Sequence, residues 1–381
     1  MAMKLGEPVD ARIPWVRRIQ DLDEARATLA HGPQMKALRR AGEALGDAVR
    51  EGAKAVAVRT LPLTSLLYPT KFAFNNACRV PAPYVVMQHR CLLVQVQAEG
   101  TIRNILFNPT DYETSRETPF FRKTIDRMGG DRVANLMVEQ EPHVDVQLRQ
   151  HGVAPEDIDV IAFDHFHTQD LRPLLGSPVP DAAGRSLPAR FPNAVLLAPR
   201  VEWDDWDDLH PMQRAWFIED GKRGVPDDRV VRFDADLRLG EGCLLLRTPG
   251  HTTGNQTLFV HGREGVFGCS ENGTSADNWA PYESTIPGLR QYARQYEVEI
   301  VLNSNTPEMG AIQYNSMILE KSVVDRVPHA PAFVQMFPSS EVQHTRTVAP
   351  GVKPAVRFGN RDHGTVQTRK PISRGEAAAA E

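Results

Sequence analysis

Short stretches with alternating or continuous apolar positions predict many strands along this chain. The stretches "YVVMQHRCLLVQVQ" and "TIRNILFNP" lie on either side of "AEG", which predicts two strands joined by a turn. "IDVIAF" and "AVLLAP" are short and rich in apolar residues, as is typical of buried strands. Further strands are expected at "DRVVRF", "GCLLLRTP", "QTLFVHG", "GVFGCS" and "EIVLNSN".

Apolar residues at helical spacing predict helices before and between these strands. The helical segments are 21–56, in which Gly32-Pro33 separates two helices, and then 118–152, 200–221 and 286–298. Strands come first, helix and strand then alternate, and a strand-rich run precedes a last helix and strand. This order predicts a layered α/β protein with mixed sheets and helices on the outer faces.

The same pattern divides the chain into three parts. Residues 1–75 are rich in Ala, Leu, Arg and Glu and predict an N-terminal helical extension. Residues 76–338 carry the strands and form the main domain. Residues 339–381 are rich in Pro, Gly and charge, which predicts an extended C-terminal tail. The extension and the tail leave room for contacts in a homo-oligomer.

Composition narrows the class of protein. The chain has 381 residues with a formal net charge of −4, so it lacks the basic footprint of a nucleic-acid-binding protein. No apolar run has the length of a membrane span, and the N-terminus lacks the apolar core of a secretory signal. We therefore expect a cytoplasmic protein that acts on a small molecule. Its four cysteines include no CxxC pair, which argues against a zinc ribbon.

Two histidine-bearing loops suggest a metal site. In "FDHFHTQDL", His165 and His167 are two residues apart at the end of a strand, so both imidazoles can face one point. In "LRTPGHTTGNQTL", the turn at Pro249-Gly250 presents His251 at the end of another strand. Imidazole nitrogen is a ligand that suits zinc and iron. Either motif alone is weak, and the pair is much more specific.

Together these motifs resemble those of the metallo-β-lactamase-fold hydrolases, and "FPNAVLLAPRVEWDDW" and "GVPDDRVVRF" resemble the lactonase-type branch of that superfamily. The resemblance covers about residues 80–310. It implies a four-layer αββα sandwich with metals held in loops along one edge of two sheets. It also implies that His165, His167 and His251 hold the first metal, whose bound water would supply hydroxide at neutral pH.

The chain departs from the family at its second metal site. The family motif is HxHxDH, whereas Gln169 stands at the Asp position and Asp170 at the last His position. Cys269 stands where the bridging Asp is usual. The final His is missing, and "EIVLNSN" offers Asn303 and Asn305 in its place.

Three interpretations fit these departures. In the first, one metal occupies the three-histidine site, and Asp170 acts as general base or orients the attacking water. In the second, Asp170 and Cys269 complete an unusual two-metal site, with Gln169 or an Asn as a weak ligand. In the third, the site has decayed, and the domain binds a ligand without catalysis.

The leading hypothesis is a metal-dependent hydrolase that directs a metal-activated water at an ester, lactone, amide-like or phosphoester group of a small molecule. Its cofactor would be one or two zinc ions, with iron or manganese as alternatives. The alternative enzyme is a mononuclear non-haem iron oxygenase on the same fold, and the alternative outside enzymes is a degenerate binding protein.

Several other residues could contribute to the site. Asp164 could accept a hydrogen bond from an imidazole, and Glu271 and Asn272 could reach the cleft. The tryptophans at 203, 206 and 216 could wall an apolar substrate pocket. We interpret His89 as an ordinary core or surface histidine.

Overall fold

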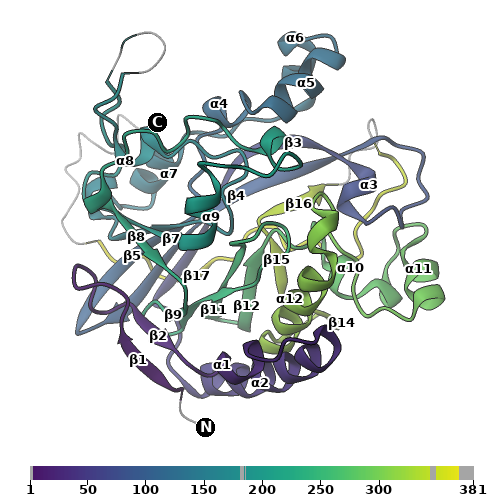
Figure 1. The fold of residues 1–381 in the computed structure, drawn as a ribbon, viewed down its shortest axis with the longest axis horizontal. Coiled ribbons are helices and arrows are strands. Elements are labelled where there is room, and N and C mark those ends of the chain that lie inside the picture. The colour runs from purple at the N-terminus through teal and green to yellow at the C-terminus, as the bar shows by residue number, and fades with distance from the viewer. Residues whose placement is uncertain (1–2, 181–183, 185, 344–348, 369–381) are drawn as a thin grey trace.

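The computed structural model describes residues 3–180, 184, 186–343 and 349–368. Two sheets lie face to face, and helices cover both outer faces (Figure 1). The first sheet has seven strands among the described residues. In spatial order they are β1 (Leu5–Pro8), β2 (Arg17–Ile19), β9 (Asp236–Arg238), β10 (Cys243–Arg247), β11 (Gln256–Gly262), β12 (Gly265–Ser270) and β15 (Met336–Pro338). Its pairs are antiparallel except for β12 with β15.

The second sheet has eight strands among the described residues. Its spatial order is β17 (His363–Gly364), β3 (Ala57–Pro69), β4 (Tyr84–Ala98), β5 (Thr101–Phe107), β6 (Val160–Ala162), β7 (Val195–Pro199) and β8 (Val230–Phe233), and β16 (Ser340–Gln343) also pairs with β4. The four strands β5 to β8 are parallel. A separate hairpin joins β13 (Arg326–Val327) and β14 (Ala330–Val334).

Side chains that alternate along the strands define the layers. On β4, Leu92 and Val94 enter the core between the two sheets, whereas Cys91 and Leu93 face the opposite side. The inter-sheet core also takes Leu245 from β10 of the first sheet. A β-sheet that is apolar on both faces must be covered on both.

The helices supply the two outer layers. On the first sheet, α2 (His31–Glu51) packs beside α12 (Gly310–Val323), and both bury leucines against the strands. The second sheet is covered by α7 (Val144–Gln150), α8 (Arg172–Leu175) and α9 (Arg200–Asp205). The helices α5 (Pro119–Arg127) and α6 (Asp131–Met137) project from the body at the top of Figure 1.

The remaining helices are short. They are α1 (Asp23–Arg26), α3 (Thr70–Ala73), α4 (Tyr112–Ser115), α10 (Ala276–Trp279) and α11 (Leu289–Tyr296), with 3₁₀ turns at Pro155–Asp157, Arg214–Trp216, Asp227–Arg229, Pro281–Glu283 and Pro307–Met309. None of the helices in the described ranges is long and apolar enough to cross a bilayer.

The structure confirms the expected αββα sandwich with mixed sheets. The structure departs from the expected division into a helical extension, a main domain and a tail, both in residues 1–75 and after residue 338. Residues 1–75 contain the long helix α2, but they also contribute β1 and β2 to one sheet and β3 to the other. Prolines at 62 and 69 interrupt the alternation of β3, which hid this strand from pattern reading.

The expected C-terminal tail also joins the fold. Its first residues form β16 beside β4, and His363 and Gly364 pair with β3 as β17. Residues 344–348 and 369–381 of this tail lie outside the described residues. Such short strands carry too few residues for a period-two pattern to stand out from their Pro- and Gly-rich surroundings.

Candidate metal centre

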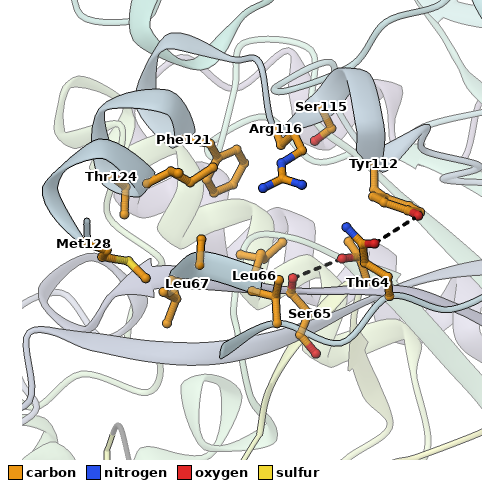
Figure 2. A pocket seen from close by; sticks show the side chains of 14 residues that line it. Thr64, Ser65, Leu66, Leu67, Tyr112, Ser115, Arg116, Phe121, Thr124 and Met128 are labelled. Carbon is orange, nitrogen blue, oxygen red and sulfur yellow. Dashed lines mark hydrogen bonds between the residues drawn. The ribbon is translucent and has the colours of Figure 1, made fainter. Parts of the chain in front are cut away.

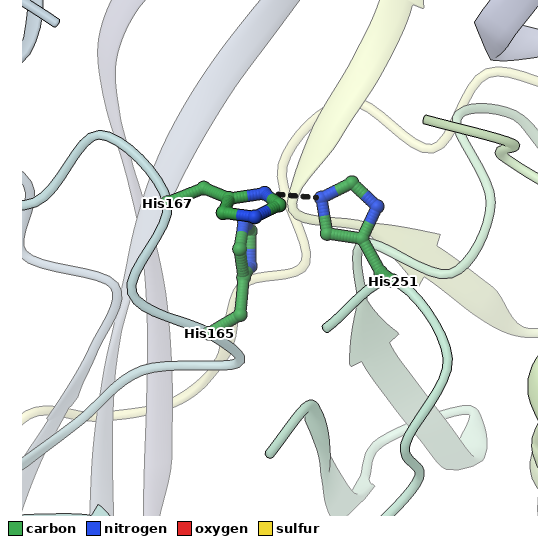
Figure 3. Close-up of side chains that lie close together, drawn as sticks. All are labelled: His165, His167 and His251. Carbon is green, nitrogen blue, oxygen red and sulfur yellow. Dashed lines mark hydrogen bonds between the residues drawn. The ribbon is translucent and has the colours of Figure 1, made fainter. Parts of the chain in front are cut away.

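Two loops at one edge of the sandwich bring three histidines together. The loop after β6 carries His165 and His167, and the loop after β10 carries His251 (Figure 3). One ligand nitrogen from each ring lies within 4.8 Å of the others. Within the described parts of the chain, no other group of three or more His, Cys, Asp or Glu side chains converges in this way.

The ring of His165 is fixed by a buried carboxylate. Its Nδ1 donates to Asp164 Oδ1 over 2.7 Å, which leaves Nε2 available to a metal. Asp164 also accepts from Asn108 Nδ2 over 3.1 Å and from the Ser339 hydroxyl. Burial alone would lower the pKa of His165, but the neighbouring Asp164 carboxylate outweighs it and raises that pKa. The expectation that Asp164 supports an imidazole is thus met by direct geometry.

The other two rings have outer partners of opposite kinds. The Nε2 of His167 donates to Gln213 Oε1 over 2.8 Å, whereas Nδ1 of His251 accepts from Asn303 Nδ2 over 3.2 Å. Burial, together with the charge of His165, lowers the pKa of both His167 and His251 well below the ordinary value. Both imidazoles are therefore neutral at pH 7, which is the form that binds metals.

One pair of ring nitrogens has the spacing of zinc ligands. His167 Nδ1 and His251 Nε2 face each other at a hydrogen-bonding distance of 3.3 Å (Figure 3). Zinc–nitrogen bonds of about 2.0–2.1 Å at tetrahedral angles place two nitrogens roughly 3.3–3.4 Å apart. The outward N–H bonds of His165 and His167, to Asp164 and Gln213, are typical of metal-binding histidines.

A buried glutamate ties the two histidine loops together. Glu202 on α9 accepts from the backbone N of Phe166 over 2.6 Å and from Thr252 Oγ1 over 2.6 Å. Burial raises the pKa of Glu202 to about 7. A Cβ on Gly254 would lie 2.5 Å from Glu202 Cβ, so only glycine allows this close approach. Glu202 was not among the residues predicted from the sequence, because its partners Phe166 and Thr252 lie in distant segments.

Two expected ligands lie elsewhere. Asp170 accepts from Nε and Nη2 of Arg172 over 2.9 and 2.7 Å and is not part of the converging group. Thr168 has φ 64°, so the extended alternation ends there and the Asp170 side chain turns toward Arg172. Cys269 lies in the inter-sheet core with its Sγ 3.5 Å from Ser339 Oγ, and burial raises the pKa of its thiol.

A cavity opens beside the three histidines. Its described lining includes Tyr68, His89, Gln169, Glu271 and Asn305, with Trp216 on one side. Glu271 accepts from the backbone N of Ser340 over 2.9 Å, and burial together with the Asp164 carboxylate raises its pKa to about 8. Glu271 and Asn272 were both expected to reach the cleft, and Glu271 lines it. Asn272 is buried behind it, where its Oδ1 accepts from the backbone N of His251.

An apolar chamber adjoins this cavity (Figure 2). Leu66 and Leu67 of β3 form one wall, and Phe121 and Met128 form the other. The two spaces share the lining residues Thr64, Leu66, Ser115 and Phe121. A molecule at the histidines can therefore extend an apolar part under α5 and α6.

His89 gives a test of the site's protonation. Its ring nitrogens contact Ser340 Oγ at 3.0 Å and Thr110 Oγ1 at 2.9 Å, and burial lowers its pKa from 6.5 to about 4. The unfolded chain therefore takes up this proton first as the pH falls. Stability from neutral His89 is complete above pH 6.5 and is lost between pH 6.5 and 4, by roughly 3 kcal/mol at most.

We expect urea unfolding in the presence of a chelator to detect this loss when wild type is compared with His89→Gln. The free energy of unfolding of wild type minus that of His89→Gln should decrease as the pH falls below 6.5. His329→Gln, at an exposed position, serves as the control and should show no such trend. A wild-type minus His89→Gln difference that stays constant from pH 7.5 to 4.5 would contradict a neutral buried ring.

The chain was compared with protein-family models, with curated proteins and with solved structures. No family model matches the chain, and no curated protein matches it. A probable metal-dependent hydrolase from Staphylococcus aureus aligns at 13% identity and TM-score 0.46, over 69% of this chain and 84% of that one. The dizinc quorum-quenching lactonase AidC aligns at 13% identity and TM-score 0.45, over 83% and 97%.

A quorum-quenching N-acyl homoserine lactone lactonase aligns at 18% identity and TM-score 0.42, over 65% of this chain and 88% of that one.

Proposed function

We propose that the chain is a metal-dependent hydrolase that holds one zinc ion through His165, His167 and His251 and cleaves an uncharged ester or lactone. The observation that carries the proposal is the convergence of three oriented imidazoles from two loops. When bound, such an ion supplies Lewis acidity and lowers the pKa of water toward neutrality.

The surroundings favour one ion. Asp170 is engaged by Arg172, and Cys269 lies in the inter-sheet core. Asn303 uses its Oδ1 to accept from the Tyr68 hydroxyl over 2.7 Å and its Nδ2 to donate to Glu271 O over 2.9 Å. These partners support the one-metal part of the first interpretation, but not the role that it gives to Asp170.

The chain's own groups divide the remaining work. Asp164 and Gln213 hold the rings of His165 and His167 in place. Glu271 is the carboxylate among the described lining residues of the cavity. Because its pKa of about 8 keeps it largely protonated at neutral pH, we assign to it the role of general acid: it would give its proton to the leaving oxygen and regain one from the next water.

The cavity favours an uncharged substrate. No Lys or Arg is among its described lining residues, whereas phosphate groups are usually bound by such side chains. The adjoining chamber has Arg116 among its lining residues, but its surface is mostly apolar and suits a hydrocarbon group. An ester or lactone with such a group fits the cavity at the histidines better than a phosphoester.

Metal analysis tests this function. Protein purified without chelator or oxygen should contain about one equivalent of zinc and hydrolyse δ-decanolactone or phenyl acetate, and chelation should stop hydrolysis. Two equivalents would favour the two-metal site. Iron with oxygen consumption would favour the oxygenase, and protein that takes up no metal would favour a binding protein.

A substitution at Asp170 separates the one-metal and two-metal sites. We expect Asp170→Asn to keep its full metal content, because the carboxylate binds Arg172 and not the histidine group. Losing the charge-assisted bonds should lower stability by about 1–3 kcal/mol. Metal content by mass spectrometry and unfolding by urea measure the two effects. A variant that lost half or more of its metal would show that Asp170 is a ligand.

A further inference from the structure

Two amide side chains beside the histidines have unused hydrogen-bonding atoms. The Asn305 residue is 7% exposed and lines the cavity, yet neither its Oδ1 nor its Nδ2 has a partner within the described part of the chain. Gln169, 4% exposed, lines the same cavity. It donates from Nε2 to His167 O over 3.2 Å, but its Oε1 is unpartnered among the described residues.

The lack of hydrogen-bond partners is not general in this loop, because the neighbouring Asn303 has them. It is fully buried, and its amide meets Tyr68, His251 and Glu271. Folded proteins keep few buried polar atoms without partners, because each such atom has lost its hydrogen bonds to water and gained none in return. A free donor and a free acceptor on Asn305, facing a cavity, therefore point to a partner that is not part of the chain.

The backbone supports this interpretation. Thr168 is a β-branched residue at φ 64°, a left-handed conformation that such residues rarely adopt. This conformation places Gln169 at the cavity instead of continuing the extended segment. Strain of this kind persists where function requires a side chain in a particular place.

We propose that Asn305 and Gln169 form a polar subsite that binds a substrate group with an N–H beside a C=O. Asn305 Nδ2 donates to the carbonyl and Asn305 Oδ1 accepts from the N–H, a paired arrangement that one amide side chain can make. Gln169 Oε1 accepts a further N–H. A primary carboxamide and a ring lactam both present this edge, and an N-alkylated amide does not.

This subsite deepens the proposed function, since it specifies a feature of the substrate of the same site. It implies that the substrate carries an unsubstituted carboxamide or a lactam in addition to the bond that is cleaved. Discrimination by a buried polar pair is strong, because a ligand without the matching group leaves the pair unsatisfied.

Binding of small amides tests the subsite without any need for turnover. The probes are hexanamide and ε-caprolactam, each paired with its N-methylated form, titrated into the purified protein by calorimetry. We expect wild type to bind each N–H probe about tenfold more tightly than its N-methylated form. Asn305→Leu should bring each ratio to about one. Comparing hexanamide with ε-caprolactam separates an open-chain amide from a ring amide.

Stability distinguishes a ligand-binding role from a structural one. Asn305→Leu removes unpartnered buried atoms and should raise the melting temperature or leave it unchanged. The matched control Asn303→Leu breaks three contacts and should lower it. Gln169→Met gives a second variant, which should weaken binding of hexanamide, the probe with a second N–H, more than binding of ε-caprolactam, and should retain its metal.

Equal binding of N–H and N-methylated probes by wild type would overturn the subsite. So would a fall in melting temperature for Asn305→Leu as large as that for Asn303→Leu. Loss of metal from Gln169→Met would make Gln169 a metal ligand and remove it from the subsite. Selective probe binding by a protein that hydrolyses no ester would instead reject the proposed function and leave the subsite standing.

Discussion

His251→Ala is expected to leave the protein without a tightly bound metal and to reduce hydrolysis by on the order of a thousandfold or more. The reason is geometric: His251 is the sole contribution of its loop to the converging group, and the remaining pair comes from a single loop. Two neighbouring imidazoles cannot hold an ion as three do. Metal content by mass spectrometry and initial rates on δ-decanolactone measure the two losses.

The control for this variant is His329→Ala, at an exposed position away from the cavity lining. It should keep both its metal and its activity. Because His251 is buried, circular dichroism should show that the variant is folded before its rates are compared. If folded His251→Ala kept one equivalent of metal and wild-type rates, the reaction would take place somewhere other than this centre.

Glu202→Ala is expected to have the largest effect on stability, a loss of about 3–5 kcal/mol in the free energy of unfolding. The substitution removes the acceptor for Phe166 N and Thr252 Oγ1, so both donors stay buried without partners. It also releases the two histidine loops from each other. Metal affinity should therefore fall by about 10- to 100-fold.

Urea unfolding with a chelator present and metal competition with a chromophoric dye measure these two effects. Asp205→Ala is a matched control on the same helix, because the exposed carboxylate of Asp205 accepts from a single group of the described chain, Thr253 Oγ1 in the adjacent loop. It should cost less than about 1 kcal/mol. A Glu202→Ala variant as stable as Asp205→Ala would show that the loops are held by other contacts.

The parts of the site that could be predicted are local in sequence. His165 and His167 follow from the period of an extended segment, and His251 follows from a Pro-Gly turn at a strand end. The buried strands were recognisable for the same reason, since alternation needs only neighbouring residues. These local patterns, together with a family resemblance, led to the four-layer fold.

The rest depends on contacts between distant segments. Glu202 stands out only when α9 packs against the two loops, and Ser339 approaches Asp164 only because β16 pairs with β4. The orientation of Asp170 depends on one backbone angle, at Thr168. A single sequence carries no direct signal for such angles, so the contact between Asp170 and Arg172 could not be predicted from it.

The pairing of β16 with β4 has a consequence for how the protein matures during synthesis. Ser339 and Ser340 supply hydrogen bonds to Asp164, Glu271 and His89. During synthesis, His165, His167 and His251 leave the ribosome before these serines do. The hydrogen bonds to Asp164, Glu271 and His89 can therefore form only after residues 339 and 340 have been made, so the three histidines reach their final surroundings later than they are synthesised.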